Sequence, residues 1–154
     1  TTVSGDAKAA HAQAAGADHV LNYKTDDVVK AVSELTEGTG VDLIIEVEFG
    51  ANIDVMQHII KPYGTIVTYG SQANRTPEIP FYPLMYKAIT LKMVIVYLLT
   101  DDAREASIRD INGLLQEEKL TAAVAETYPL QDIVKAHESV ESGVTMGNVV
   151  LSIP

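Results

Sequence analysis

The stretch VDLIIEVEFGANIDVMQHIIKPYGTIVTYGS, residues 41–71, contains a strand, a helix and a second strand in that order. Its opening VDLIIEVE is nearly continuous in branched apolar residues, which is typical of a strand buried on both faces of a parallel sheet. A helix is predicted over about 52–60, and a proline and a glycine then mark the turn before the strand that contains Ile66 and Val67. A helix that joins two strands in this way makes them parallel.

The same alternation continues on both sides of this stretch. An alanine-rich helix follows a short β-type stub at residues 1–4, and HVLNY at 19–23 is predicted to be the next strand. Farther along the chain, a proline-rich segment leads into an apolar strand at about 89–98. The fold class is therefore α/β, a parallel sheet with helices on both faces. Because the stub runs directly into a helix, the first βαβ step lacks its beginning.

The pattern changes after about Leu99, where an amphipathic helix, a further helix and a final strand follow. We predict two parts, residues 1–99 and residues 100–154. The second part either extends the sheet or belongs to a neighbouring domain.

Composition excludes several function classes. The 154 residues are 47% hydrophobic, and 11 Lys and Arg against 21 Asp and Glu give a formal charge of -10, which repels nucleic acids and anionic membranes. The chain has no cysteine, which excludes disulfides, a thiolate nucleophile and Cys-ligated zinc and fits a reducing compartment. The apolar runs are too short to cross a bilayer. We expect a soluble cytoplasmic protein that binds neither nucleic acid nor membrane.

Side chains suited to catalysis are few. Glu46 and Glu48 lie two apart on one predicted strand, which puts their carboxylates near the separation of some acid/base pairs. We favour the interpretation that they are ordinary residues at the carboxyl end of the strand. The four histidines lack metal-ligand spacing, and His137 falls on an apolar helix face, which favours a core position. Ser71 lacks the motif of a nucleophile elbow. We therefore predict no metal site and no nucleophile.

Three turns that follow predicted strands carry small residues: VSGDAK, EFGAN and YGSQA. Ligands of parallel α/β sheets bind at the carboxyl ends of the strands, so Gly50, Gly70 and Ser71 are predicted where backbone approaches a ligand closely. Ordinary turn chemistry explains any one of these turns. Three of them at one edge favour a ligand crevice.

Four segments, AGADHVLNY, GVDLIIE, KPYGTIVTYGS and YPLQDIVKAHESVESGVTMGNVVLSIP, resemble the zeta-crystallin-like NADPH:quinone oxidoreductases of the medium-chain dehydrogenase/reductase superfamily. The resemblance runs through essentially the whole chain. It implies a Rossmann-like sheet that lacks the first β-strand, the glycine loop and the first helix. Residues 1–99 would form part of a dinucleotide-binding domain, and residues 100–154 would return to a catalytic domain outside this chain.

The resemblance also implies a set of cofactor contacts. Those for the adenosine half of the cofactor are Ser4, Lys8, Tyr23 and Gly50. Those for the nicotinamide half are Thr68, Tyr69, Gly70, Ser71, Val94, Ile95 and Val96. Asn148 stands where the family often has a lysine. Lys8 beside the ribose favours NADP, whereas Asp6 leaves NAD as the alternative.

The function implied by the resemblance is hydride transfer from NADPH to a quinone or an enone, without zinc. No catalytic residue can be assigned, and the 154 residues alone are expected to be inactive. The alternative is a non-catalytic dinucleotide-binding or dimerising fragment. A homodimer is expected through the strand 89–98, because a long apolar strand at a sheet edge pairs readily with a second copy.

Overall fold

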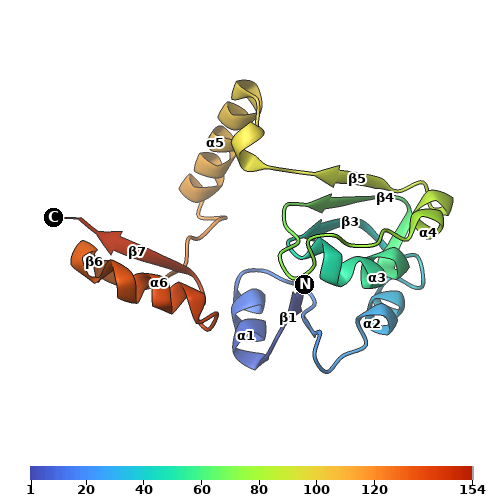
Figure 1. Cartoon of the computed structure of the whole chain (residues 1–154), viewed down its shortest axis with the longest axis horizontal. Coiled ribbons are helices and arrows are strands. Elements are labelled where there is room, and N and C mark those ends of the chain that lie inside the picture. The colour runs from blue at the N-terminus through green and yellow to red at the C-terminus, as the bar shows by residue number, and fades with distance from the viewer. Residues whose placement is uncertain (154) are drawn as a thin grey trace. The chain divides into compact units, whose positions relative to one another are not determined.

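The computed structural model describes residues 1–153, in which parallel strands alternate with helices (Figure 1). The strands are β1 (Thr2–Val3), β2 (Leu21–Asn22), β3 (Val41–Glu46), β4 (Ile60–Thr68), β5 (Thr90–Met93), β6 (Val124–Pro129) and β7 (Asn148–Ser152). The helices are α1 (Asp6–Ala14), α2 (Val28–Leu35), α3 (Phe49–Ile59), α4 (Phe81–Tyr86), α5 (Asp101–Gln116) and α6 (Ile133–Glu141), with 3-10 turns η1 (Val96–Leu98) and η2 (Leu130–Asp132). The predicted α/β fold class is confirmed. None of the helices described is long and apolar enough to cross a membrane.

The chain divides into two compact units. The first, called here the sheet unit, comprises Thr2–Ser4 and Leu21–Leu99. The second, called here the terminal unit, comprises Thr1, Gly5–Val20 and the chain from Thr100 onward. The core and the sheet of β3, β4 and β5 belong to the sheet unit, whereas β6 and β7 belong to the terminal unit.

The core of the sheet unit lies between one face of the β3–β4–β5 sheet and the helices α3 and α4 (Figure 1). In the parallel register Ile44 is opposite Ile66, and Ile66 is opposite Leu91. The buried residues of this cluster are Phe49, Ile53, Met56, Ile60, Ile66 and Leu84. Full burial of such a side chain contributes about 1.5–3 kcal/mol, so this small cluster is the main source of stability in the unit.

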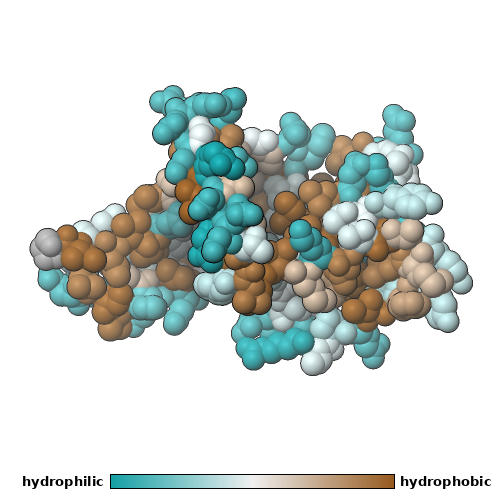
Figure 2. Space-filling view, turned by 90° about the horizontal axis from the view of Figure 1, so that it is seen from above, coloured by the Kyte–Doolittle hydropathy of each residue, from teal (hydrophilic) through white to brown (hydrophobic). Residues whose placement is uncertain are grey.

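The other face of these strands remains open. Successive strand residues point to opposite faces, so Leu43 and Ile45 lie opposite the core, and they are 51% and 70% exposed. Helices were expected on both faces of the sheet, but within the sheet unit they cover only one face of β3–β4–β5. Figure 2 shows brown, hydrophobic side chains among the polar ones on the side of the chain in view.

β1 and β2 form a separate parallel pair, in which Thr2 is opposite Leu21. Neither strand pairs with β3, so the sheet is interrupted between β1 and β3. This is the position at which the resemblance places the first strand of a Rossmann sheet. The interruption leaves one edge of β1 and one edge of β3 without a neighbouring strand among residues 1–153.

The strand predicted over 89–98 is shorter in the structure. β5 ends at Met93, the N–H of Val94 donates one last hydrogen bond to the carbonyl of Thr68 (2.8 Å), and residues 96–98 form a 3-10 turn. β4 itself ends at Thr68, so the chain beyond Val94 has no neighbouring strand in the part of the protein that the structure describes. The prediction of a strand to Leu98 is wrong for this physical reason.

The terminal unit is built around the parallel pair of β6 and β7, with α6 connecting them. Ala136 is the buried residue of α6. His137 is exposed, because the face that it shares with Ile133 and Val140 is largely uncovered. The core position predicted for His137 is therefore wrong.

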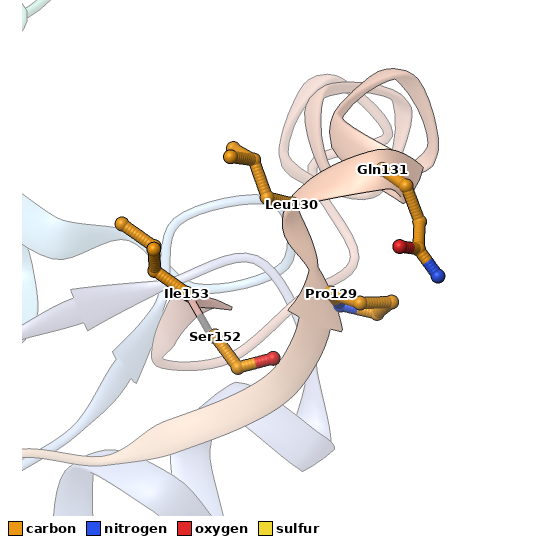
Figure 3. Close-up of a pocket in the computed structure, with 5 residues that line it drawn as sticks. All are labelled: Pro129, Leu130, Gln131, Ser152 and Ile153. Atoms are coloured by element: carbon orange, nitrogen blue, oxygen red, sulfur yellow. The ribbon is translucent and has the colours of Figure 1, made fainter.

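An open pocket of about 520 Å³ lies at the carboxyl ends of β6 and β7 (Figure 3). Its lining residues are Pro129, Leu130, Gln131, Ser152 and Ile153. Leu130 and Ile153 project toward the same side, whereas Pro129 and Gln131 project away from it. No charged side chain lines this pocket, so it offers a ligand few directed contacts.

Candidate functional site

The carboxyl ends of β3, β4 and β5 meet at one edge of the sheet, and backbone hydrogen bonds join the turns that follow them. The N–H of Tyr69 donates to the carbonyl of Glu46 (3.1 Å), and the N–H of Phe49 donates to the carbonyl of Gly70 (3.0 Å). The edge where parallel strands end is where such sheets bind ligands. The predicted contacts that the structure brings to this edge are Gly50, Thr68, Tyr69, Gly70, Ser71, Val94, Ile95 and Val96.

Gly50 and Gly70 lie where two backbone segments cross too closely for a side chain. A Cβ atom on Gly70 would lie 2.5 Å from the carbonyl oxygen of Val47, and one on Gly50 would collide with the carbonyl oxygen of Asn74 and lie 2.7 Å from Ser71 Oγ. Both distances are shorter than real Cβ contacts, so these positions require glycine. The close approach is to the chain itself, and packing of the turns explains both glycines without a ligand.

Ser71 joins the same two turns through its hydroxyl. Its Oγ accepts a hydrogen bond from the N–H of Gly50 (2.8 Å) and donates one to the carbonyl of Asn74. Both partners are backbone groups, and neither can act as a base toward the hydroxyl. In this structure the Ser71 hydroxyl therefore joins the two turns.

Glu46 and Glu48 direct their carboxylates to backbone donors. Oε1 of Glu46 accepts from the N–H of Glu48 (2.6 Å), and the Glu48 carboxylate accepts from the N–H groups of Gln72 and Ala73 (2.7 Å for Ala73). The two carboxylates therefore have different partners and do not face one substrate bond. This arrangement supports the strand-end interpretation over an acid/base pair.

An apolar depression of about 530 Å³ lies between the end of β4 and the segment after β5. Its lining residues are Val67, Tyr69, Val94, Ile95, Val96 and Tyr97. A volume of this size is within the range of roughly 300–1,000 Å³ found for small-molecule sites. Of the lining residues, Tyr69 and the three apolar residues 94–96 are predicted nicotinamide contacts.

Ser4 and Tyr23 follow the paired strands β1 and β2. The N–H of Tyr23 donates to the carbonyl of Val3 (3.1 Å), so the two residues lie at the carboxyl ends of adjacent strands. Ser4 is half-buried and Tyr23 is exposed. The structure thus brings these two predicted adenosine contacts together.

Lys8 and Asn148 belong to the terminal unit, where their polar groups already have partners. Nζ of Lys8 donates to the carbonyl of Gly143 (3.3 Å). The backbone N–H and Nδ2 of Asn148 both donate to the carbonyl of Ala123 (2.7 and 3.1 Å). Asn148 thereby holds the start of β7, a role that the sequence did not predict.

Charged groups elsewhere in the sheet unit serve the fold. Burial lowers the pKa of Lys87, whose Nζ donates to the carbonyls of Gln57 and Ile60 (2.7 Å each) and so joins the end of α3 to the start of β4. The hydrogen bond and charge of Lys61 lower the pKa of Asp42. Within residues 1–153, no three His, Cys, Asp or Glu side chains gather as metal ligands.

A family model described as zinc-binding dehydrogenase matches residues 15–151. The chain belongs to this family. The resemblance to quinone oxidoreductases of the medium-chain dehydrogenase/reductase superfamily is thereby confirmed, as is the Rossmann-like fold class. The residues that the structure describes do not supply a ligand set for the zinc in the family's description.

Three similar proteins illustrate the relationship. The chain is 25% identical to 2-haloacrylate reductase from Burkholderia sp., with 97% of this chain and 46% of that protein aligned. It is 26% identical to quinone oxidoreductase 1 from Escherichia coli K12, over 97% of this chain and 47% of that protein. A mycobacterial protein solved in complex with NADPH superposes with a TM-score of 0.85 at 29% identity, over 99% of this chain and 49% of that one. The chain therefore spans about half the length of each of these three proteins.

The role of Glu48 was missed by sequence reasoning. Its partners Gln72 and Ala73 lie 24 and 25 residues farther along the chain. An acidic residue just before a helix is a local signal, but it indicates an N-cap, and the Glu48 side chain makes no such bond to α3. No local pattern could have revealed a contact between two turns.

Proposed function

We propose that the chain forms the cofactor-binding part of an NADPH-dependent oxidoreductase that reduces a quinone or a conjugated carbonyl compound. The observation that carries this proposal is the apolar depression at the carboxyl ends of β4 and β5, the edge at which parallel α/β sheets bind dinucleotides. The names of two relatives, a quinone oxidoreductase and a 2-haloacrylate reductase, support a reaction of this class.

The residues that line the depression fit the nicotinamide half of the cofactor. When bound, NADPH supplies the hydride, while the protein supplies orientation and an environment without water. Val94, Ile95 and Val96 would form the apolar wall beside the nicotinamide ring. The backbone of residues 68–71, fixed by hydrogen bonds to the turn after β3, would border its ribose.

The adenosine half would lie at the ends of β1 and β2. Ser4 would contact the ribose, Tyr23 would lie beside the 2′-phosphate, and Gly50 would flank the adenosine. Lys8 would exchange the neutral carbonyl of Gly143 for the phosphate, since an ammonium bonds an anionic acceptor more strongly than a neutral one. This lysine favours NADPH, and NADH is the alternative cofactor. Asn148 remains a weaker candidate, because its amide is already bonded.

We also propose that two copies pair through residues 89–98. Met93 and Leu98 are 69% and 77% exposed in the single chain, and a second copy that packs against this segment would bury them. A non-catalytic dinucleotide-binding or dimerising role is the second candidate, because the chain aligns with less than half of each curated relative named above. We expect no quinone reduction by these 154 residues alone.

Calorimetric titration with NADPH and NADH tests the proposed function. We expect weak binding of NADPH, and we expect Lys8→Ala to weaken NADPH about three- to tenfold while NADH changes less, because one charge-assisted phosphate contact is lost. Lys119→Ala is the control, since Lys119 pairs with Glu117 on the surface. Equal binding of both cofactors by both proteins would remove Lys8 from the site, and no binding of either would contradict the function.

A further inference from the structure

Glu48 ties two turns of the sheet edge together, and none of the cofactor contacts proposed above uses it. Its backbone carbonyl accepts hydrogen bonds from the N–H groups of Ala51 and Asn52 (3.1 Å each), which starts α3. Its side chain makes no capping bond to α3, and the carboxylate instead accepts from the N–H groups of Gln72 and Ala73. One residue therefore joins the start of α3 to the loop after β4.

The loop of residues 72–74 is exposed, and Asn74 at its end is bonded to Ser71, to Gly50 and to the N–H of Thr76. The hydrogen bonds described for residues 1–153 give the N–H groups of Gln72 and Ala73 no acceptor other than Glu48. Bonds from N–H groups to an ionised carboxylate are roughly twice as strong as neutral ones, and two on adjacent residues fix the direction of the backbone. A glutamine at position 48 would offer one acceptor oxygen and turn a donor group toward the other N–H.

We propose that Glu48 is a positioning residue for the nicotinamide half of the dinucleotide. By holding the loop after β4, it keeps the backbone at Gly70 and Ser71 in the conformation that borders the cofactor. Ser71 and Asn74 connect the two ends of this loop to Gly50, and Glu48 holds residues 72 and 73 between them, so loss of Glu48 frees the middle of the loop without removing a core side chain. This inference rests on the proposed function.

Two measurements on the full chain test it, with Glu48→Gln and Glu48→Ala compared with wild type. We expect both amides, of Gln72 and Ala73, to exchange faster in Glu48→Gln, and the one that faces the amide donor of the glutamine to exchange about tenfold faster, because it loses its acceptor. We expect NADPH to bind about five- to tenfold more weakly, whereas adenosine 2′,5′-bisphosphate, which lacks the nicotinamide half, binds within about twofold of wild type. Glu34→Gln on α2 is the control, because the Glu34 side chain is largely exposed and its carboxylate pairs with Lys30 on the same helix.

Each outcome decides the matter. Unchanged exchange at residues 72 and 73 would show that Glu48 does not hold the loop. Equal weakening of both ligands would mean a general structural role and would overturn the positioning role. Wild-type chain that binds neither ligand would contradict the proposed function itself, and the exchange rates would still show whether the loop depends on Glu48. Glu48→Gln keeps the shape of the side chain, so the test stands if Glu48→Ala fails to fold.

Discussion

Single residues set how closely the turns of the sheet edge can pack. Gly70→Ala would place a Cβ 2.5 Å from the carbonyl oxygen of Val47, and because that oxygen is backbone it cannot move alone. We predict that this substitution lowers the free energy of unfolding by about 1–3 kcal/mol, as other overpacking changes do. Urea unfolding followed by circular dichroism measures the effect.

Gly113 provides the matched control. It lies within α5, and a Cβ built there meets nothing within 4 Å. Gly113→Ala is therefore expected to stabilise the helix by roughly 0.5–1 kcal/mol, because alanine is the better helix former. Equal and small effects of the two substitutions would show that the turns at the sheet edge adjust easily.

At the scale of elements, a polar network around Glu126 connects β6 to α6. Oε2 of Glu126 accepts hydrogen bonds from the hydroxyl of Tyr128 and from Ser139 Oγ (2.8 Å), and Ser139 lies 3.0 Å from Thr145 Oγ1. The Tyr128 bond, followed by the Ser139 bond, lowers the pKa of Glu126. The same bond to Glu126 raises the pKa of Tyr128.

These shifts fix the direction of the pH dependence. The contribution of Glu126 is present above the ordinary pKa of a glutamate and is lost as the pH falls through its lowered pKa. The contribution of Tyr128 is present below the ordinary tyrosine pKa and is lost as the pH rises through its raised pKa. The bond from Ser139 of α6 is thus weakened at low pH, and the bond between Tyr128 and Glu126 within β6 is weakened at high pH.

We predict that Glu126→Gln lowers the pKa of Tyr128 toward its ordinary value of 10.0, because the charged acceptor is gone. Titration of tyrosinate absorbance, with and without Tyr128→Phe, isolates this one residue among the seven tyrosines of the chain. The nearby charge of Lys135 acts in both proteins and does not affect the comparison. Glu138→Gln should leave the titration unchanged, and a Tyr128 titration insensitive to Glu126→Gln would contradict the network.

The sequence predicted elements where local pattern decides them, and it failed where distant partners do. β3 and β4 could be predicted because their runs of branched apolar residues fit the pleated, partly buried surface of a sheet. The end of β5 could not, because it depends on where β4 ends. The exposure of His137 depends on what covers α6, and the contact of Glu48 depends on a turn 24 residues away. The same holds for the site residues. Their position at the carboxyl ends of the strands follows from the order of elements along the chain, whereas the hydrogen-bond partners of Lys8 and Asn148 do not.

At the scale of the whole molecule, the exposed segment after β5 leads us to predict self-association. Pairing two such segments about a two-fold axis would give their backbone groups partners and bury apolar side chains, including Ile95, which is 54% exposed. The formal charge of -10 does not prevent this, because salt screens charges beyond roughly 10 Å. Sedimentation at micromolar concentration should show a species larger than 16.6 kDa.

Ile95→Lys should return the protein to a monomer, because a lysine in the paired segment would be buried without a partner. Ile79→Lys is the control, since Ile79 is also exposed but lies in the loop before α4. A wild-type protein that sediments as a single 16.6 kDa species, unaltered by Ile95→Lys, would show that the edge is covered in another way.

The open face of the β3–β4–β5 sheet has a calorimetric consequence. Unfolding raises the heat capacity of a protein because apolar groups enter water, normally by about 12–15 cal/mol/K per residue. Leu43 and Ile45 are already largely in water in the folded chain, so their exposure adds little to that increment. The stability of the isolated chain should therefore vary with temperature along a flatter curve than is usual for its size. A partner that covered this face would bury Leu43 and Ile45, and its binding would therefore be accompanied by a negative change in heat capacity.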